Sequence, residues 1–470
     1  MTNLRNSKRA SDATTLTWQR CLSQADFLCT LFRLLDEHGI RYCVLHSWEG
    51  LPENLPSDLD LAVHPTDAGK LPFIFADLRE KGYKPVQCLN YFVNAYYFVF
   101  FWLEGSETKY VAVDMIFEHR RSGLIVPSGE ALVAGRRKKD IFWVPDPATE
   151  FAYLLAKNTW KGAAPPRRAQ RLKLLVTELG SAQAERIAGE LFGRRLNRQV
   201  VQACASGQVS ELLGRIRTQP WWTSLATNPL KLLAYLLADG LRRIRRWFQP
   251  SGLLIALFGP DGVGKSTLAA ELSELFSPAF RTCRVFHWRP GLLKGSSTAV
   301  TCPHDQAPRG SFASAAHALG FALDYWLGFA LVVRPLLARS GLVIFDRYFY
   351  DLLVDPRRYR YGGPLWLARV LSAFIPKPNL ILFLDAPEEV VLSRKREVES
   401  EEVTRQRGSY LKKAKELPSA RVIDATLPLL QVRARAGQVV TEYLAQRFES
   451  RHGVAWLRIA VARAHVATGS

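Results

Sequence analysis

Residues 259–266 form a glycine-rich turn that follows an apolar run and precedes an amphipathic segment. The letters GPDGVGKS fit the pattern G-x-x-x-x-G-K-[ST] at every fixed position. Glycines let backbone N–H groups turn inward around phosphate oxygens, and the helix that follows directs its positive end toward them. The pattern therefore predicts a phosphate-binding loop. We expect its contacts to come from Gly259, Asp261, Gly262, Gly264, Lys265, Ser266 and Thr267.

Two side chains of this loop, together with the residues at the end of another strand, can bind phosphates and Mg²⁺. Lys265 can reach the β- and γ-phosphates of a nucleotide, and the Ser266 hydroxyl can be a ligand of Mg²⁺. Asp346 ends the apolar run LVIFD, and open α/β sheets bind ligands at such carboxyl ends of strands. We expect Asp346 to hold the Mg²⁺ shell and Arg347, directly after it, to hold a second phosphate.

A run of mixed charge, SRKREVESEEVTRQRGSYLKKAKEL, follows a further apolar strand. It has two interpretations: a solvated helix face stabilised by pairs four residues apart, or a mobile lid that brings arginines to a transferring phosphoryl group. We favour the lid because the run follows a phosphate-binding loop in a domain of kinase size. Its candidate catalytic residues are Arg394, Arg396, Arg405 and Arg407.

Four motifs follow one another between residues 251 and about 450. They are G-x-D-x-x-G-K-S in the loop, Asp346-Arg347-Tyr348, LFLDAPEEVVLSRKR before the charged run, and RVIDAT near the end. Together they resemble the thymidylate kinase branch of the P-loop nucleoside monophosphate kinases. The resemblance implies ATP and Mg²⁺ as cofactors, and phosphoryl transfer to dTMP or another nucleoside monophosphate. By similarity, Asp261 contacts an acceptor hydroxyl, Arg347 the acceptor phosphate, and the lid arginines the γ-phosphate.

Two stretches depart from the family pattern and leave the acceptor open. Where the family usually has Arg-Glu-Pro-Gly, this chain has WRPG at 288–291, without the acidic residue. The stretch ALGFALDYWLGFALVVRP, in the place of the base-recognition helix, is aromatic and lacks an early arginine. Similar chains accompany surface-polysaccharide synthesis, so a nucleotidyltransferase or kinase acting on a sugar or glycan phosphate is an alternative. An ATP-binding assembly protein at the inner membrane surface is another.

Three carboxylates lie on strand-like runs near the N-terminus. Asp58 and Asp60 alternate in SDLDLAV, so both point to one face, and Asp114 lies in VAVDMIF. Converging carboxylates of this kind serve two-metal nucleotidyl transfer. The layout resembles the minimal nucleotidyltransferase fold, which implies metal binding by these three residues. Because the family's Gly-Ser turn is His46-Ser47 here, we expect the fold rather than retained catalysis.

The elements that position these residues divide the chain into parts. Residues 1–145 alternate apolar runs with turns, residues 146–250 read as helices, and residues 251–450 alternate strands with helices. The last group of strands is apolar on both faces, as in a parallel sheet covered by helices. We expect an α/β protein: an α+β nucleotidyltransferase-like domain, a helical connector and a P-loop kinase domain, followed by a tail at 451–470.

The overall charge favours anionic partners. Lys and Arg number 63 against 43 Asp and Glu, a net charge of +20. We expect a nucleotide and a phosphorylated small-molecule or glycan acceptor, and no nucleic acid polymer, because no basic and aromatic signature for one stands out. The seven scattered cysteines suit a reducing cytosol rather than a disulfide framework or a zinc site. A second copy of the chain, forming a homodimer, is a further partner to test.

Two apolar helices bear on the location of the protein, which we expect to be cytoplasmic. Residues 312–333 are long enough to span a membrane, but His317 and Asp324 near the middle favour a buried core helix. Residues 229–248 combine an apolar stripe with arginines, as helices on anionic membranes do. We favour an interdomain helix packed on the kinase core there and keep peripheral contact with the inner membrane as the alternative.

Overall fold

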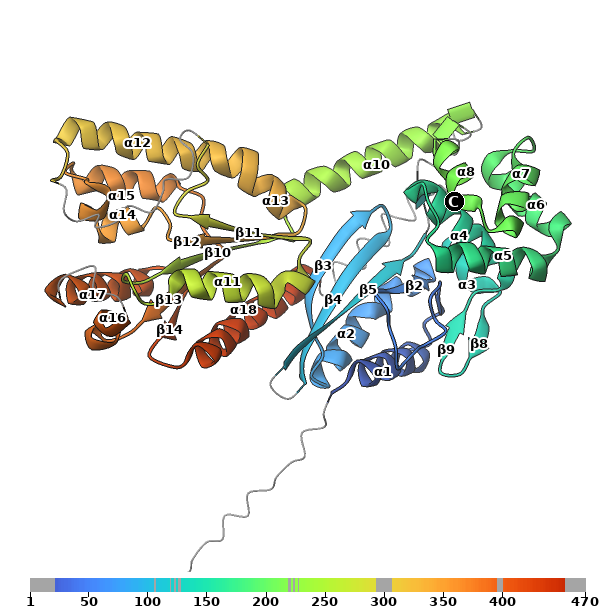
Figure 1. Ribbon diagram of the computed structural model, residues 1–470, viewed down its shortest axis with the longest axis horizontal. Coiled ribbons are helices and arrows are strands. Elements are labelled where there is room, and N and C mark those ends of the chain that lie inside the picture. The colour runs from blue at the N-terminus through green and yellow to red at the C-terminus, as the bar shows by residue number, and fades with distance from the viewer. Residues whose placement is uncertain are drawn as a thin grey trace, which may run out of the picture.

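Two five-stranded sheets, one in each half of the chain, carry the residues of interest (Figure 1). They belong to a computed structural model that describes residues 22–104, 107–118, 120–121, 124–125, 128–218, 221–222, 225–226, 228–292, 307–394 and 400–452. Most of the predicted tail lies outside these ranges.

The first sheet has the strand order β1-β2-β5-β4-β3, in which β2 and β5 are parallel and the other neighbours antiparallel. Its strands are β1 (Tyr42–Val44), β2 (Leu59–Val63), β3 (Lys84–Phe92), β4 (Ala95–Glu104) and β5 (Glu107–Ile116). The smaller elements around it are α1 (Gln24–Glu37), η1 (Pro65–Lys70), α2 (Leu71–Glu80), β6 (Arg120–Arg121), β7 (Leu124–Ile125), α3 (Gly129–Ala134), β8 (Arg137–Lys139) and β9 (Phe142–Val144).

Helices follow the first sheet, and all but the last of them share one apolar cluster with it. They are α4 (Pro147–Lys161), α5 (Pro166–Leu179), α6 (Ser181–Phe192), α7 (Asn197–Ser206), α8 (Val209–Arg215) and α10 (Pro229–Phe248). Helix α4 starts at Pro147 after Asp146, whose carboxylate accepts hydrogen bonds from the N–H groups of Ala148 and Thr149 and so satisfies the first turn. This cap fixes the start of the helix that later supplies Lys157.

The second sheet is parallel throughout, with the order β11-β12-β10-β13-β14. Its strands are β10 (Leu253–Phe258), β11 (Thr282–His287), β12 (Gly341–Asp346), β13 (Leu380–Asp385) and β14 (Ala420–Asp424). The helices are α11 (Lys265–Phe276), η2 (Ser277–Ala279), α12 (Ser311–Gly328), the π-helical turn η3 (Phe329–Val333), α13 (Arg334–Ala338), α14 (Asp351–Val354), η4 (Arg357–Tyr359), α15 (Leu365–Phe374), α16 (Glu388–Arg394), α17 (Ser400–Glu416) and α18 (Leu429–His452). The predicted parallel sheet with flanking helices is confirmed.

Strand β10 shows why the strands of this sheet appear in the sequence as continuous apolar runs. All six of its residues are buried, and alternate side chains enter opposite cores. Leu253, Ile255 and Leu257 pack toward α11 and α18. Their neighbours pack with α12 and α15 on the other face. Burial on both faces holds the carboxyl end of β10 firmly, which is where the glycine-rich loop begins.

The two halves share apolar cores instead of meeting at a wet surface. Val86 and Phe101 of the first sheet belong to the same cluster as Leu275 of α11 and Leu444 of α18. In return, Phe448 of α18 packs in the core beneath the first sheet. Figure 1 shows α18 beside β3 and β4. The halves are therefore held in one fixed arrangement.

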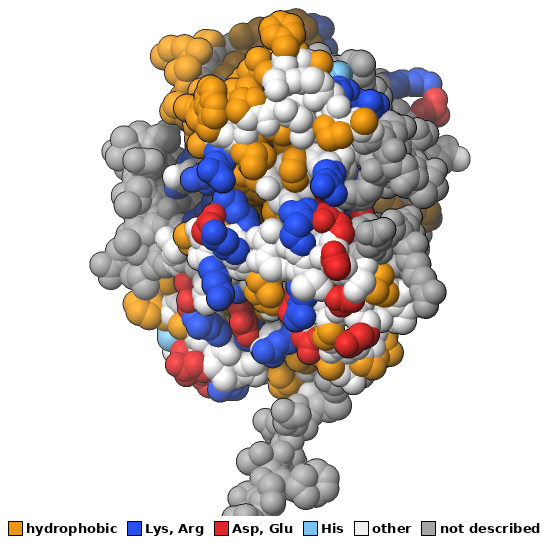
Figure 2. Space-filling view, turned by 90° about the vertical axis from the view of Figure 1, so that its left-hand side faces the viewer, with side chains coloured by type: hydrophobic (Ala, Val, Ile, Leu, Met, Phe, Trp, Pro, Cys, Tyr) orange, Lys and Arg blue, Asp and Glu red, His pale blue; other side chains and the backbone are white. Residues whose placement is uncertain are grey.

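Helix α12 is not the buried core helix that its composition predicts. Its small residues Ala318 and Ala322 are fully buried, but Phe312 is 90% and Leu331, in η3, is 66% exposed. Only one side faces the sheet, so the larger apolar side chains on the other side meet solvent. Ser311–Ala338 is the one helix of the described ranges whose length and apolar character would let it cross a membrane, a property that core helices also have. Figure 2 shows hydrophobic side chains gathered at this end of the molecule.

Candidate active site

The glycine-rich loop joins β10 to α11, and its glycines are required by backbone geometry. The φ values of Gly259, Gly262 and Gly264 are 142°, 83° and 103°, a range that residues with a Cβ atom rarely adopt. A Cβ atom on Gly259 would also lie 2.6 Å from the carbonyl oxygen of Leu384. The loop therefore brings its own backbone close to β13, and leaves the N-terminus of α11 facing the space where phosphates bind.

Lys265 is buried against the loop that it serves. Its Nζ donates hydrogen bonds to the carbonyl oxygens of Gly259 at 2.9 Å and Pro260 at 2.7 Å, and lies 3.7 Å from the carboxylate of Asp261. The carbonyl groups of the loop thus fix the ammonium group at the phosphate loop. The oxygens of a bound phosphate would compete with these carbonyl oxygens for hydrogen bonds from Lys265.

Ser266 and Asp346 form a pair of hard oxygen ligands that fits Mg²⁺. The Ser266 hydroxyl donates to Asp346 Oδ2 at 2.5 Å, while Oδ1 of the same carboxylate is buried with no hydrogen-bond partner among the described residues. Burial alone would raise the pKa of Asp346, but His287, Lys265 and Ser266 outweigh it and lower the pKa. The carboxylate is ionised at neutral pH. One carboxylate suffices because Mg²⁺ usually keeps several waters and substrate phosphates as ligands.

Arg347, directly after Asp346, is buried and held by two carboxylates. Its φ of 78° is unusual for arginine and costs about 1–3 kcal/mol, and it turns the side chain away from the course of β12. The guanidinium donates to Asp351 Oδ2 at 2.8 Å and to Asp261, which Arg358 also contacts. Burial opposes ionisation of Asp351, yet Arg347 and a hydrogen bond from Tyr410 lower its pKa. The geometry joins the phosphate loop to two arginines suited to an anionic group.

Aromatic side chains form a wall next to these arginines. The Trp288 ring stacks on Tyr359 with centroids 4.4 Å apart, and the edge-on Phe321 ring lies 4.6 Å away. Tyr359 also donates to the carboxylate of Asp351 at 2.8 Å, which ties the wall to the Arg347 cluster. Such a wall can pack against a planar group.

Arg289, in the departing WRPG stretch, has an acidic partner from another element. Its guanidinium lies 3.6 Å from the carboxylate of Asp324 on α12 and 5.6 Å from the ring of Trp288. The backbone N–H of Gly291 donates to the same carboxylate at 3.1 Å. Asp324 therefore places an acidic group beside the WRPG stretch, a contact that the local sequence pattern could not reveal.

The predicted lid arginines are occupied elsewhere in this conformation. Arg407 makes two hydrogen bonds to Asp385, of 2.6 and 2.9 Å, and Arg405 binds Glu402 at 2.6 Å. Arg394 donates to the carbonyl oxygen of Ala425 at 2.9 Å. Arg396 lies outside the described residues. Within the described part of the chain, none of the other three arginines makes a hydrogen bond to the phosphate loop, although Asp385, the partner of Arg407, directly follows Leu384, whose carbonyl oxygen the loop approaches. Their contact with a γ-phosphate stays a prediction.

Comparison with known proteins gives the family of this site. Residues 258–436 match the family model of thymidylate kinase. A thymidylate kinase of Xylella fastidiosa (strain M12) is 31% identical over 229 residues, which cover 45% of this chain and 97% of the relative. A thymidylate kinase of Xanthomonas campestris pv. campestris (strain B100) is 30% identical over 213 residues, covering 42% and 87%. The chain belongs to the thymidylate kinase family. It is a P-loop kinase that uses ATP and Mg²⁺.

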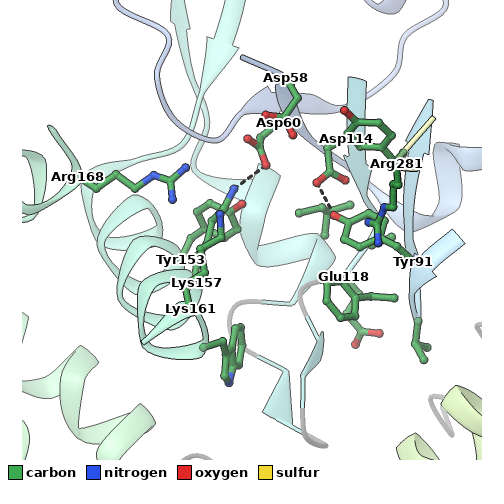
Figure 3. A pocket seen from close by; sticks show the side chains of 16 residues that line it. Asp58, Asp60, Tyr91, Asp114, Glu118, Tyr153, Lys157, Lys161, Arg168 and Arg281 are labelled. Carbon is green, nitrogen blue, oxygen red and sulfur yellow. Dashed lines mark hydrogen bonds and ion pairs between the residues drawn. The ribbon is translucent and has the colours of Figure 1, made fainter. Parts of the chain in front are cut away.

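A cavity of about 220 Å³ lies beside the first sheet, and all its lining residues except Arg281 are outside the residues that match thymidylate kinase. Asp58, Asp60 and Asp114 line it together, and the parallel register of β2 and β5 places Asp60 opposite Asp114 (Figure 3). Four cationic side chains also line it: Lys157, Lys161, Arg168 and Arg281. The last comes from the thymidylate kinase half, because it directly precedes β11.

The carboxylates of this cavity differ in their charge. Asp60 accepts from Lys157 Nζ at 2.7 Å and lies 3.0 Å from His46 Nε2. Burial opposes its ionisation, but His46 and Lys157 hold the pKa of Asp60 well below the usual range. Burial and the charge of Asp60 raise the pKa of Asp114 to about 8, and its Oδ2 accepts from Tyr91. At neutral pH we therefore expect Asp60 ionised and Asp114 protonated.

This arrangement bears on the predicted metal site. Within the described ranges, no group of three or more His, Cys, Asp or Glu side chains is placed to hold a metal ion. The ion pair of Asp60 with Lys157 is the contact that a metal would have to replace. Metal binding by Asp58, Asp60 and Asp114 stays a prediction.

Proposed function

We propose that the thymidylate kinase half transfers the γ-phosphoryl group of ATP to the phosphate of a nucleoside monophosphate, with dTMP the first candidate. The observation that carries this proposal is the position of Arg347. Its guanidinium is buried, oriented by Asp351, and in contact with Asp261 of the phosphate loop. An acceptor phosphate bound there lies next to the donor phosphates.

The residues of the chain have distinct parts in the proposed reaction. Backbone N–H groups of the loop and Lys265 bind the donor phosphates and stabilise the charge that develops on the transferring group. Ser266 and Asp346 would hold Mg²⁺, which supplies further charge neutralisation on the β- and γ-phosphates. Arg347 and Arg358 orient the acceptor, so that its phosphate oxygen forms a bond to the γ-phosphorus as the bond to the bridging oxygen breaks and ADP leaves.

The aromatic wall supports a nucleoside as the organic part of the acceptor. Tyr359, half-buried and stacked on the buried Trp288, offers an aromatic ring against which a base can pack, worth about 0.5–1.5 kcal/mol beyond the apolar area that it buries. The pair of Arg289 and Asp324 beside the wall offers polar groups for a base edge or a sugar hydroxyl. A sugar or glycan phosphate remains the competing acceptor.

A substrate panel tests the proposal. The purified chain is incubated with ATP and Mg²⁺ together with nucleoside monophosphates or sugar phosphates, and products are identified by mass spectrometry. We expect a nucleoside diphosphate as the product, and a loss of about 100-fold or more in rate for Lys265→Ala. Lys377→Ala, an exposed lysine away from the loop, is the control. An undiminished rate for Lys265→Ala, or product only from sugar phosphates, would contradict it.

We further propose that the N-terminal half is nucleotidyltransferase-like and that its cavity binds a ligand without catalysing transfer. Support comes from the register that pairs Asp60 with Asp114 and from the four cationic residues that line the cavity. The double variant Asp58→Asn/Asp60→Asn, which removes both charges but keeps side chains that can form hydrogen bonds, should then leave the kinase rate unchanged. Release of pyrophosphate from nucleoside triphosphates by the natural chain, lost in the double variant, would show instead that nucleotidyl transfer is retained.

A further inference from the structure

Helix α10 exposes an apolar stripe to solvent over its whole length. Each member of the stripe is more than half exposed, and the members recur every three or four residues: Leu230, Leu233, Leu237, Leu241, Ile244 and Phe248. This spacing places them on one side of the helix. We call this stripe the α10 face.

The opposite side of α10 fixes the helix on the body of the protein. Leu232 and Tyr235 are buried there. Arg242 Nη1 donates to the carbonyl oxygen of Asn90 at 3.1 Å in the first half, and Arg246 donates to that of Ala338 at 2.5 Å in the second. The predicted role between the halves and an outward-facing α10 face therefore coexist in one helix.

The charges around the α10 face have one sign. The helix contains five Lys and Arg and a single acidic residue, Asp239. Asp239 is already paired with Arg242 at 2.6 Å and Arg243 at 2.8 Å. Five basic residues against one acidic residue leave the helix with a net positive charge, and Lys231, Arg243 and Arg245 are exposed beside the stripe. A neutral or basic partner would not match this surface.

Apolar exposure continues beyond α10 along the same side of the molecule. Helix α13 packs against α10, and α12 extends the line in Figure 1. On α12 and η3 the exposed apolar side chains again recur at a spacing of four: Leu319, Leu323, Leu327 and Leu331. Figure 2 shows the hydrophobic side chains at the end formed by α12 and α15, with Lys and Arg side chains, interspersed with Asp and Glu, below them.

We propose that the α10 face is a docking surface for an anionic lipid bilayer, on which the helix lies parallel to the membrane plane. An apolar stripe with cationic neighbours and aromatic residues is how helices bind at the level of lipid headgroups. Trp222, 57% exposed before the helix, and Trp247 and Phe248 at its end supply the aromatic residues. The net charge of the whole chain, +20, adds long-range attraction between the protein and an anionic membrane.

Flotation of the purified full chain with vesicles tests this proposal. One vesicle population contains phosphatidylcholine alone, and the other equal amounts of phosphatidylcholine and phosphatidylglycerol. We expect flotation with the anionic vesicles only, weakening as NaCl rises from about 0.1 M to about 1 M, because the Debye length falls from about 10 Å to about 3 Å. Arg243→Gln/Arg245→Gln should lower the partition coefficient about fivefold for each charge removed.

A matched pair of variants separates the α10 face from apolar exposure in general. Leu237→Asp/Leu241→Asp should abolish flotation. Leu103→Asp/Leu174→Asp, at residues 55% and 50% exposed on β4 and α5, should float like the natural chain. Circular dichroism and an unchanged kinase rate without vesicles establish that each variant is folded.

Other outcomes would overturn the proposal. Absence of flotation, equal flotation with neutral vesicles, or equal loss in both double variants would exclude an electrostatic membrane surface on α10. Sedimentation of the chain as a dimer that Leu237→Asp/Leu241→Asp dissociates, without flotation, would show that a second copy covers the face.

Discussion

Ser266 and Asp346 are eighty positions apart in the chain, yet the hydroxyl of one donates a 2.5 Å hydrogen bond to the carboxylate of the other. The contact joins the start of helix α11 to the end of strand β12, which pairs with β10 in the parallel sheet. It leaves the second carboxylate oxygen buried and unsatisfied by the described residues. A divalent cation is the ligand that this pair of oxygens suits best.

Asp346→Asn should therefore weaken the dependence on Mg²⁺. The amide has no charge to offer the cation, so we expect the Mg²⁺ concentration for half-maximal rate to rise and the rate to fall by about 100-fold. A titration of kinase rate against Mg²⁺ checks this. Asp424→Asn is the control, because Asp424 ends the edge strand β14 and is exposed. An unchanged Mg²⁺ titration for Asp346→Asn would contradict the assignment.

Arg347→Lys should raise the KM for the acceptor and leave the KM for ATP nearly unchanged. A lysine ammonium cannot bind Asp351 and Asp261 at once in the fixed geometry of a guanidinium, so the acceptor phosphate loses an oriented partner. We expect kcat/KM for the acceptor to fall about 100-fold. Steady-state kinetics with each substrate varied in turn checks this, with Arg369→Lys on the exposed side of α15 as the control. Equal changes in both KM values would argue against the assignment.

Lys157→Ala should destabilise the protein because it removes Lys157, which together with His46 holds the buried carboxylate of Asp60. The side chains of Asp60 and Lys157 are 3% and 14% exposed, so the cost should approach the roughly 3–5 kcal/mol of a broken buried ion pair. Urea unfolding measures it, and Lys173→Ala on the surface of α5 is the control. Lys157→Ala/Asp60→Asn should recover much of the loss. A double variant as unstable as the single one would show that packing, not charge, is responsible.

Asp114→Asn should flatten the dependence of stability on pH. The pKa of Asp114 is raised in the folded protein, so the folded chain keeps a proton that the unfolded chain releases once the pH exceeds about 4. The stability from this residue is therefore present at low pH and is lost as the pH rises toward about 8. Asparagine cannot ionise and still offers an oxygen to Tyr91. Melting temperatures of both proteins from about pH 5 to about pH 8 check this, and parallel curves would contradict it.

The linear sequence was sufficient where a single segment sets the geometry. The glycine positions of the loop, Lys265, Ser266 and the strand end at Asp346 follow from local pattern and from the rule that ligands bind at the carboxyl ends of parallel strands. The position of Asp351, four residues after Arg347, gave only a weak indication that the two side chains would form an ion pair. Nothing local announced that Tyr410 also binds Asp351, because that contact depends on how α17 packs.

Tertiary packing decided the rest. Asp324 reaches Arg289 from α12, and Lys157 reaches Asp60 from α4, across stretches that no periodicity connects. The charged run gave the lid arginines but not their partners, Asp385 and Glu402. Composition also could not tell which side of α12 would be covered, because an apolar helix reads the same whether neighbours surround it or touch one side.

The exchange of apolar side chains between the halves has a consequence for how the chain folds. Val86 and Phe101 complete a core built mainly by the kinase half, and Phe448 completes one built mainly by the first half. A chain cut near residue 250 would expose both sets of partners to water at once. The fused enzyme should therefore melt in one cooperative step, with neither half surviving as an independent folding unit.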